Sequence, residues 1–573
     1  MIDITLASRG IENKISDWRV SEKENFSDHN TILFTILTEC KGQMDSYRNV
    51  RRTDWTLYRS ELTENIDNTT FLETDSLEVH TDKLTNSITR AYLDSCRVTR
   101  TKKKTKPPWW TGELTNLKRE ATRLKSRYRR NPTEENAVAK KDALRKYSLE
   151  IQHAKRKKWQ TFCTEMMDMS NQSRISKILK VGEKHTIGTI KNNQTGELSS
   201  TPEEALQLLL KAHFPDQETG DPVQPGEEEE EQNQVITHDE NLVEEMCNRM
   251  LHKDALKAAF KSFKPHKAPG VDGIFPIMIQ KGIDILQPEL LNIYRKSIRE
   301  RRVPEQWTVS RVAFIPKPGK DDYMDPKSYR PISLTSFLLK GLERLVLWDL
   351  QVTVEQEKPL RPDLFSYREG KSTEDALHKV VHKIEKALSS QQVAVAMFLD
   401  IEAAFNNATF GGMKQVLMEK GVVMPLTQWI TNTLKSRIVT ATQGFHKASK
   451  AVTKGCPQGG ILSPYLWNLI MDDLLRMFPN LHSTYVIVYA DDVMILGIGI
   501  DEKIIVDNLK RDIVILQTWA RKHKLNFSPS KTKLMLFSKR KERIQPELKI
   551  GDQVISWVDD FKYLGMHLDN KLN

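Results

Sequence analysis

Three carboxylates carry the most distinctive chemistry that the sequence can support. Asp491 and Asp492 stand side by side in the otherwise apolar run VIVYADDVMIL (486–496), and Asp400 ends a second apolar run, QVAVAMFLD (392–400). Burying a carboxylate is costly unless it is paired or bound to a metal. If the two runs pair as neighbouring strands, the three carboxylates converge at one end of a sheet, where they are stable only around cations. Oxygen-only ligands beside phosphate groups favour Mg²⁺, with Mn²⁺ as a substitute.

Such a cluster indicates phosphoryl chemistry. Two divalent ions about 3.5–4 Å apart can activate a 3′-hydroxyl and stabilise a leaving pyrophosphate. An isolated Asp-Asp pair is more often a solvated turn. Here the flanking apolar strands, and a second strand-terminal Asp 91 residues upstream of Asp491, favour the metal site.

The elements that must position these carboxylates belong to a mixed α/β (α+β) domain. The segment TYVIVYADDVMILGIGI (484–500) predicts a hairpin of two apolar strands with Ala-Asp-Asp at the turn. The run that ends at Asp400 predicts a central strand, followed by a helix or turn rich in Ala and Phe. From about residue 240 onward, short β-runs alternate with helical patterns, which is typical of such a domain.

The net charge of +11 is concentrated in one segment. Residues 100–158 contain 20 Lys and Arg against 6 Asp and Glu, so the rest of the chain has a formal charge of −3. Apolar residues from Leu114 to Leu124 recur at helical spacing, and a second helix is expected at about 134–167. A solvated helical face is the usual explanation of a charge run. The one-sided sign favours contact with nucleic acid instead.

Composition excludes several other classes of protein. The 573 residues, 39% of them hydrophobic, are enough for several globular domains. The five cysteines lie far apart with no CxxC pair, so neither a zinc site nor a disulfide framework is indicated. The start MIDITLASRG has no signal-peptide pattern, and aspartates interrupt the most apolar stretch, 483–500. These features predict a soluble intracellular protein without a membrane partner.

Further motifs surround the carboxylates and carry a family resemblance. In chain order they are KAPGVDGI (267–274), VAFIPKPGKDD (312–322), SYRPISLTSFLLKGLERL (328–345), FSYREGKSTEDAL (365–377), FLDIEAAFNN (398–407), KGCPQGGILSPYLWNLIMDDLL (454–475), YADD (489–492), NFSPSKTKLMLF (526–537) and FKYLG (561–565). Together they resemble the polymerase of LINE-type non-LTR retrotransposons of the Jockey/I-like branch, over roughly residues 240–573. The resemblance implies an RNA-directed DNA polymerase that adds dNTPs to a DNA primer on an RNA template with two Mg²⁺ ions.

The resemblance also implies a right-hand fold and a set of site residues. Fingers and palm would occupy 240–545, and 546–573 would hold the primer-grip region and the start of a truncated thumb. The residues that would act in the site are the catalytic metal ligands Asp400, Asp491 and Asp492, the proton donor Lys531, the nucleotide-binding Lys317, Arg330, Phe405 and Gln458, and the primer grip Tyr563, Leu564 and Gly565.

Each role has a physical reason. Arginine suits a triphosphate because it donates in a bidentate fork, and the ring of Phe405 would clash with a ribose 2′-hydroxyl. Surface lysines remain the alternative for Lys317 and Lys531, and plain packing remains the alternative for Tyr563 and Leu564. In FSYREGKST the family pattern is altered by Tyr367 and Glu369, which weakens a template-contact role for Arg368 and Lys371.

The N-terminal part carries a second resemblance. IDITLAS and SDHN resemble the last segment of the endonuclease/exonuclease/phosphatase fold, in which Asp3, Asp28 and His29 would belong to the nicking site. Residues 1–36 are therefore expected to be a remnant of that domain. The metal ligands of that fold would lie before Met1, so no endonuclease activity is expected from this chain.

Two further segments complete the expected domain order. Residues 37–213 are predicted to be a mostly helical, basic nucleic-acid-binding region, and the acidic, Pro- and Gly-rich stretch 214–239 a linker. Basic clusters such as TKKKTKPP (101–108) are compatible with a location in both nucleus and cytoplasm.

Several functions remain open on the sequence alone. The chain is either a working polymerase or a catalytically silent nucleic-acid-binding fragment of such an element. A group II intron maturase or an RNA-copying RNA polymerase is the weaker alternative. Phe405 argues against the RNA-making enzyme and SDHN against the maturase.

Overall fold

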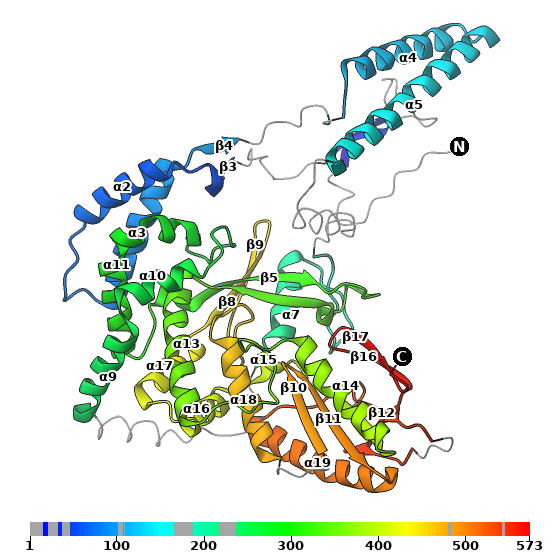
Figure 1. The fold of residues 1–573 in the computed structure, drawn as a ribbon. Helices are drawn as coiled ribbons and strands as arrows, with labels where there is room; N and C mark the ends of the chain where they lie inside the picture. Colours follow the sequence, from blue (N-terminus) through cyan, green and yellow to red (C-terminus); the bar gives the residue numbers. More distant parts are fainter. Residues whose placement is uncertain are drawn as a thin grey trace. The chain divides into compact units, whose positions relative to one another are not determined.

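The computed structural model describes residues 15–20, 32–36, 46–100, 107, 109–164, 187–216, 236–478, 484–540 and 545–572 (Figure 1). The chain divides into two compact units. The first comprises residues 1–49 and 97–184, and the second comprises residues 50–96 and 185–573. Asp3, Asp28 and His29 lie outside the described residues.

The first unit contains a basic helical hairpin and two short strand pairs. Helix α4 (Gly112–Arg130) starts at Thr111, whose side chain accepts a hydrogen bond from the Leu114 amide, and it packs against α5 (Glu134–Thr164). Leu114, Ala121 and Tyr147 form the buried core between the helices, as the helical spacing predicts. The strand pairs of this unit are antiparallel: β1 (Ile15–Val20) with β2 (Ile32–Ile36), and β3 (Ser46–Arg48) with β4 (Val98–Arg100).

The second unit is built around a five-stranded sheet. Its strand order is β10 (Thr484–Tyr489), β11 (Asp492–Gly499), β7 (Val393–Asp400), β12 (Lys533–Phe537), β15 (Ser556–Trp557). The first four strands are antiparallel to their neighbours, and β15 runs parallel to β12. Strand β7 is buried over its whole length except at Asp400, which explains its continuous apolar run.

Helices cover both faces of this sheet, and the two-residue period of the strands decides which side chains face which helices. Ala394, Ala396 and Phe398 pack in the cluster that contains α14 (Thr373–Ser389). Val395 and Met397 point to the other face and join the main core, together with α18 (Ser463–Met477) and α19 (Glu502–His523). The sheet therefore has two buried faces, and its charged residues are confined to strand ends.

A four-stranded sheet forms the second layer of the unit. Its order is β6 (Tyr329–Leu334), β5 (Val309–Pro316), β8 (Ile438–Gln443), β9 (His446–Ala451). Leu206, Leu210 and Phe214, from α7 (Pro202–His213) and its end, pack on Val312 and Val439 of this sheet.

The remaining elements complete the second unit. They are η1 (Val50–Arg52), α2 (Trp55–Asp67), α3 (Leu77–Ser95), α9 (Ile236–Met250), α10 (Lys253–Lys261), α11 (Pro276–Arg299), α12 (Glu305–Thr308), η2 (Pro326–Ser328), α13 (Phe337–Glu357), α15 (Ala404–Asn407), α16 (Phe410–Glu419), α17 (Met424–Lys435), β13 (Lys549–Ile550), β14 (Gln553–Val554), β16 (Asp560–Tyr563) and β17 (Met566–Asp569). The mixture of helices and strands agrees with the predicted α/β class. No helix among the described residues is both long and apolar enough to cross a bilayer.

The helical region expected at 37–213 is divided between the two units. Helices α2 and α3 pack on α11, where His80 lies 2.6 Å from a carboxylate oxygen of Glu289. Leu62 and Ile88 are fully buried in the main core of the second unit. Charge patterns do not reveal this division, because it depends on which apolar faces find a common core.

Two glycines hold the segment 454–460 close to its neighbours. Gly455 has φ +85°, and a Cβ on it would lie 2.6 Å from the Asn406 carbonyl oxygen. Gly459 has φ +117°, and its Cβ would lie 2.7 Å from the Ser333 carbonyl oxygen. Gln458 is therefore fixed between strand β6 and the turn after β7, and its carbonyl accepts a hydrogen bond of 2.8 Å from the Ser333 amide.

We expect Gly455→Ala to destabilise the second unit by at least about 2 kcal/mol, because the added Cβ meets backbone and an alanine at positive φ is strained. Gly411→Ala is the matched control. Gly411 lies in α16 with open space around it, so alanine should leave stability unchanged or raise it by up to about 0.5–1 kcal/mol. Chemical denaturation followed by circular dichroism measures both. Equal unfolding midpoints for the two variants would contradict the close approach at Gly455.

Candidate functional site

The structure brings the three predicted carboxylates to one end of the five-stranded sheet. Strand β11 pairs antiparallel with β7 so that Asp492 is the direct partner of Asp400. Residues paired in this way have Cα atoms about 4.5–5.5 Å apart. Asp491 lies with Ala490 in the turn between β10 and β11, and Ala490 has φ +55°. The predicted hairpin and its pairing with the Asp400 strand are confirmed.

Burial and neighbouring negative charge raise the pKa values of Asp491 and Asp492. Burial, followed by the neighbouring Asp491 and Asp400, raises the pKa of Asp492 to about 6. Burial and the charge of Asp400 also raise the pKa of Asp491, while Lys531 and Arg330 oppose the shift. Lys531 Nζ donates a hydrogen bond of 2.8 Å to Asp400 Oδ2, so an ammonium already balances part of the charge.

The donor set fits a divalent cation by its chemistry. Among the described residues, no group of three or more His, Cys, Asp or Glu side chains has the geometry of a formed metal site. Yet the donors at this sheet end are carboxylate oxygens only, and their mutual repulsion is what a cation would relieve. Asp400, Asp491 and Asp492 are the residues that would hold it.

Arg330 and Lys531 lie close enough to Asp491 to lower its pKa, and a third cation, Lys317, donates a hydrogen bond of 2.8 Å to the Lys327 carbonyl. Arg330 on β6 pairs with Ile315 across β5, and Lys317 follows β5 directly. Burial lowers the pKa of Lys317, and so do the positive charges of Arg330 and Lys531, among others. Arg330 and Lys531 therefore lie close enough to Lys317 for their charges to act on it.

Phe405 lies just past the Asp400 strand end. A left-handed residue, Ala403 (φ +47°), turns the chain from β7 into α15, which carries Phe405. The half-buried Phe405 ring is stacked on Trp467, with ring centroids 5.6 Å apart and planes 29° apart. Tyr367 meets it edge-on, at 6.2 Å and 84°.

Neither ring that contacts Phe405 was predicted to lie in the site. The sequence predicts no role for Trp467 and marks Tyr367 only as a departure from the family pattern. Their partnership with Phe405 has no signature in spacing, because the three rings come from three separate segments. The presence of aromatic residues within otherwise recognisable motifs was the only available signal.

One predicted primer-grip residue, Tyr563, lines a cavity together with Asp400 and Asp492. Strands β16 and β17 form a hairpin whose turn is Leu564 and Gly565, both at positive φ. Tyr563 is buried against Phe398, with ring centroids 5.2 Å apart. A cavity of about 420 Å³ has Asp400, Asp492, Lys531 and Tyr563 among its lining residues. Strand β16 of this hairpin and two of the three carboxylates therefore line one cavity.

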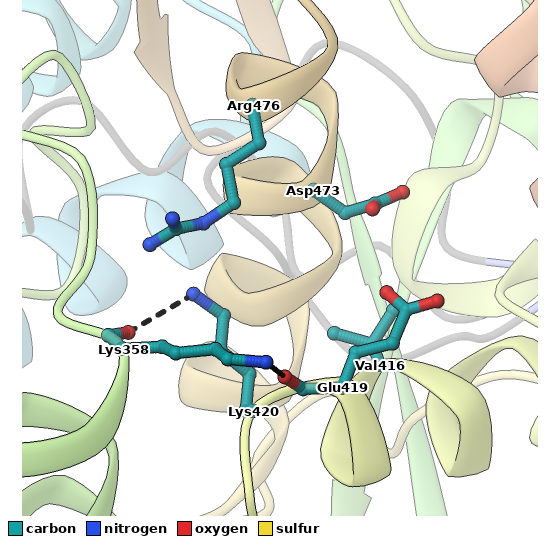
Figure 2. Close-up of a pocket in the computed structure, with 6 residues that line it drawn as sticks. All are labelled: Lys358, Val416, Glu419, Lys420, Asp473 and Arg476. Atoms are coloured by element: carbon teal, nitrogen blue, oxygen red, sulfur yellow. Dashed lines mark hydrogen bonds between the residues drawn. The ribbon is translucent and has the colours of Figure 1, made fainter.

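A separate cavity of about 310 Å³ contains none of the predicted site residues (Figure 2). Its lining residues are Lys358, Val416, Glu419, Lys420, Asp473 and Arg476. Lys420 Nζ donates to the Lys358 carbonyl at 3.2 Å, and Lys358 Nζ donates to the Glu419 carbonyl at 2.5 Å. The charged walls of this cavity are thus already engaged with the protein.

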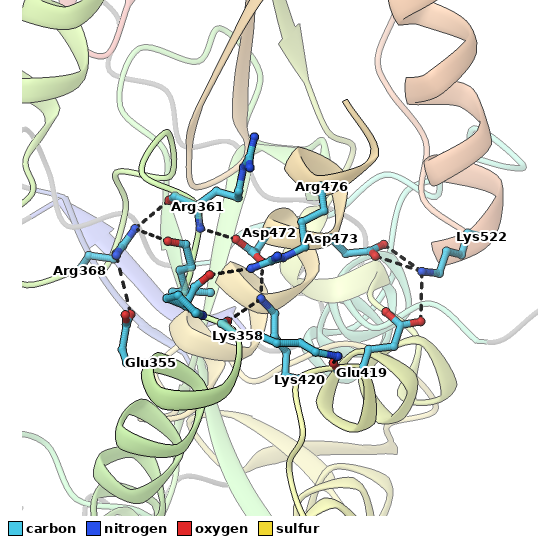
Figure 3. A network of polar contacts seen from close by, with 12 residues as sticks. Glu355, Lys358, Arg361, Arg368, Glu419, Lys420, Asp472, Asp473, Arg476 and Lys522 are labelled. Atoms are coloured by element: carbon cyan, nitrogen blue, oxygen red, sulfur yellow. Dashed lines mark hydrogen bonds and ion pairs between the residues drawn. The ribbon is translucent and has the colours of Figure 1, made fainter. Parts of the chain in front are cut away.

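Those walls belong to a polar network centred on Asp472 of α18 (Figure 3). The Asp472 side chain is fully buried and accepts hydrogen bonds from the Arg361 amide at 2.5 Å, from Arg476 Nε at 2.6 Å and from Lys420 Nζ. Arg368 donates to the Arg361 carbonyl at 2.8 Å and is paired with Glu355. Arg368 thus stabilises its own loop in this structure, which leaves little of it for a template contact.

Asp473, the next residue, is bound from the other side. Burial alone would raise its pKa, but hydrogen bonds from His523 at 2.7 Å and Lys522 at 3.1 Å lower it overall. Helix α18 is thus tied both to the loop that starts at Lys358 and to the end of α19.

Comparison with known proteins agrees with this arrangement. Residues 315–568 match the family model described as reverse transcriptase (RNA-dependent DNA polymerase). The chain thus carries a reverse transcriptase domain, and the relatives that it matches are proteins of retrotransposable and mobile elements. All of the residues proposed above for metal, nucleotide and primer lie within this reverse transcriptase domain.

Relatives match over more than this domain. The chain is 25% identical over 590 residues to the 115 kDa protein of the type-1 retrotransposable element R1DM from Drosophila melanogaster, a match that covers 99% of this chain and 54% of the relative. It is 23% identical over 595 residues to a retrovirus-related Pol polyprotein from the type-1 retrotransposable element R1 of Bradysia coprophila, covering 100% of this chain and 56% of the relative. The RNA-directed DNA polymerase from the mobile element jockey of Drosophila funebris is 29% identical over 329 residues, covering 56% of this chain and 35% of the relative. The chain thus spans about half the length of the R1 relatives it matches.

The raised pKa of Asp492 predicts a pH-dependent cost of folding. The folded protein favours the protonated form of Asp492. The free energy of unfolding is therefore highest below the pKa of the unfolded chain, near 4, and it falls as the pH rises through about 6, where folded Asp492 ionises. Asp492→Asn should therefore be more stable than the unsubstituted protein at pH 8, and the difference should shrink toward pH 4. Thermal unfolding between pH 4 and 8 without divalent ions measures this.

Asp507→Asn is the matched control on α19. A hydrogen bond from Lys510 lowers the pKa of the exposed Asp507, so any effect of this substitution at pH 8 should have the opposite sign. An Asp492→Asn variant that is no more stable at pH 8 than at pH 4, relative to the unsubstituted protein, would contradict the repulsion among the carboxylates.

Proposed function

We propose that the chain is an RNA-directed DNA polymerase that transfers deoxynucleotides to a primer 3′-hydroxyl on an RNA template. The observation that carries the proposal is the meeting of Asp400, Asp491 and Asp492 at one sheet end, within reach of the charges of Arg330 and Lys531, which have Lys317 as a neighbour. Anionic oxygens on one side and cations on the other are what a metal-bound triphosphate requires. The five-stranded sheet then corresponds to the palm, and the sheet of β5, β6, β8 and β9 to the fingers.

The carboxylates would hold two Mg²⁺ ions, which Mn²⁺ can replace, and these would activate the 3′-hydroxyl and stabilise the leaving pyrophosphate. Arg330 and Lys317 bind the triphosphate oxygens from the fingers side. Lys531 Nζ holds a proton at an ammonium whose side chain is 64% exposed, so it can turn from Asp400 toward the leaving group.

The remaining site residues bind sugar and primer. Phe405 excludes a 2′-hydroxyl, because its ring occupies the space beside the Asp400 strand end. Gln458, fixed by its backbone contact to Ser333, faces the nucleotide. The turn at Leu564 and Gly565 holds the primer terminus next to the cavity that Asp400 lines.

The basic hairpin of the first unit would bind the nucleic-acid strands. Arg156, Lys157 and Lys158 are exposed on α5. Apolar packing of the hairpin occurs between α4 and α5, so these three side chains lie outside its core, where phosphate groups can reach them.

A catalytically silent nucleic-acid-binding fragment is the second candidate function. The basic hairpin is the observation that favours it, because such a surface binds phosphate groups whether or not the protein catalyses nucleotide addition. Primer extension separates the two candidates.

We expect primer extension on poly(rA)/oligo(dT) with Mg²⁺, and we expect Asp491→Asn to reduce it by at least roughly 100-fold, because the variant lacks one metal ligand (~2.7 kcal/mol). Asp507→Asn, an Asp→Asn change on the exposed face of α19, should extend normally. RNA binding without any extension by the unsubstituted protein would favour the silent fragment.

A second prediction concerns the hairpin. Replacement of Arg156, Lys157 and Lys158 by Gln should weaken binding to single-stranded RNA. The slope of log K against log salt should fall by about 0.7 for each phosphate group that the variant no longer neutralises. Fluorescence anisotropy from 50 to 300 mM salt gives the slope.

The control triple replaces Lys503, Lys510 and Arg511, which are exposed on α19, by Gln. If both triples change the slope equally, the charges of α5 act only through net charge and the hairpin is not a binding surface.

A further inference from the structure

The ring of Phe405 is held by two other aromatic side chains. Trp467 stacks on it at 5.6 Å, and Tyr367 meets it edge-on at 6.2 Å. Trp467 is 1% exposed, whereas Tyr367 is 48% exposed and Phe405 is half-buried. The three rings therefore extend from the buried Trp467 to the exposed Tyr367.

Trp467 also holds the turn that carries the carboxylates. Its Nε1 donates a hydrogen bond of 2.9 Å to the carbonyl oxygen of Ala490, the left-handed residue before Asp491. One buried side chain thus touches both the Phe405 ring and the Asp491 turn. A displacement of its indole would move these two features together.

The residue before Tyr367 is bound to the same helix. Asn468, the neighbour of Trp467 on α18, exchanges hydrogen bonds of 2.7 and 2.9 Å with Ser366. One and two turns further along α18, Asp472 binds the Arg361 amide and Arg476 Nη2 donates to the Pro359 carbonyl at 2.6 Å (Figure 3). Residues 468, 472 and 476 share one helix face, which holds the whole loop.

The loop also reaches strand β10, which precedes the turn that carries Asp491. The Phe365 amide donates to the Val488 carbonyl at 3.0 Å, and the Val488 amide donates to the Asp363 carbonyl at 3.0 Å. Tyr367 itself has φ +52°, a strained conformation for a tyrosine. Burial raises the pKa of the Tyr367 hydroxyl, and so do the nearby charges of Asp491 and Tyr489. The loop is thus built to present this one ring beside Phe405 and the carboxylates.

We propose that Trp467 and Tyr367 are positioning residues that fix the Phe405 ring, so that selection of the sugar depends on three rings rather than one. This inference rests on the proposed function and names the sugar as the feature of the substrate that the set distinguishes. Exclusion of a 2′-hydroxyl is a steric effect. If the Phe405 ring could move aside by a fraction of an ångström, it would no longer exclude this group. Helix α18 supplies the rigidity, through Trp467 directly and through the loop of Tyr367 indirectly.

The two contacts of Trp467 can be separated by substitution. Trp467→Phe keeps a ring against Phe405 but lacks the N–H group for Ala490. It should retain the ratio of kcat/KM for dTTP over UTP within roughly twofold and lower kcat for both nucleotides. Trp467→Leu removes the stacked ring and should lower this ratio at least roughly tenfold, as should Tyr367→Leu, whereas Tyr367→Phe should leave it unchanged.

Trp429→Leu is the matched control. Trp429 is a buried tryptophan of α17 whose Nε1 donates to Ser297 Oγ at 3.0 Å, outside the three-ring set. It should lose stability as Trp467→Leu does but keep its selectivity, because the ratio is measured within the folded fraction. If Trp467→Leu and Tyr367→Leu keep the unsubstituted ratio while Phe405→Val loses it, Phe405 acts alone and the inference is wrong.

A measurement without chemistry separates this inference from the proposed function. With a dideoxy-terminated primer on poly(rA), binding of dTTP and of UTP to the protein is measured by retention of the labelled nucleotide. Selective binding that Trp467→Leu abolishes supports the three-ring set even if no extension occurs. Equal binding of dTTP and UTP by the unsubstituted protein overturns it.

Discussion

The pairing of β7 with β11 is the constraint on which the site depends. Both strands are apolar and buried, so their register is fixed by packing on both faces, and a slip by one residue would turn every side chain to the wrong face. That register sets Asp400 opposite Asp492 at the point where burial ends. Hydrophobic packing thus forces together charges that repel one another. The raised pKa of Asp492 and the ammonium of Lys531 at Asp400 are two consequences of this one arrangement.

Helix α18 transmits this arrangement to the rest of the site. Its buried Asp472 accepts three hydrogen bonds, which is how a fully buried carboxylate becomes tolerable. Through the same helix, Trp467 reaches the Asp491 turn and Asn468 reaches the loop of Tyr367. The carboxylates, the Phe405 ring and the loop between α13 and α14 therefore share one support. A substitution within α18 can therefore displace the site residues even where the substituted residue does not contact them.

The sequence predicted the parts of this structure that are encoded locally. The hairpin at 484–500, the strand ending at Asp400 and the helix at 112–130 follow from apolar periods that belong to single segments. Motifs in a constant order predicted the residues around the cavity. The contacts of Asp472 with Arg361 and Lys420, and the ring contacts of Phe405, could not be predicted, because they join segments more than 35 residues apart and depend on side-chain packing. For the same reason, charge alone did not reveal that α2 and α3 belong with the second unit.

The central claim is that three carboxylates from two chain segments together bind divalent cations. Electron paramagnetic resonance with Mn²⁺, on the protein with dTTP and a dideoxy-terminated primer on poly(rA), tests it most directly. We expect about two bound ions per chain, and we expect the tightly bound signal to disappear in both Asp400→Asn and Asp491→Asn. Bound Mn²⁺ that persists unchanged in both variants would contradict the claim, because the metal would then be held somewhere else.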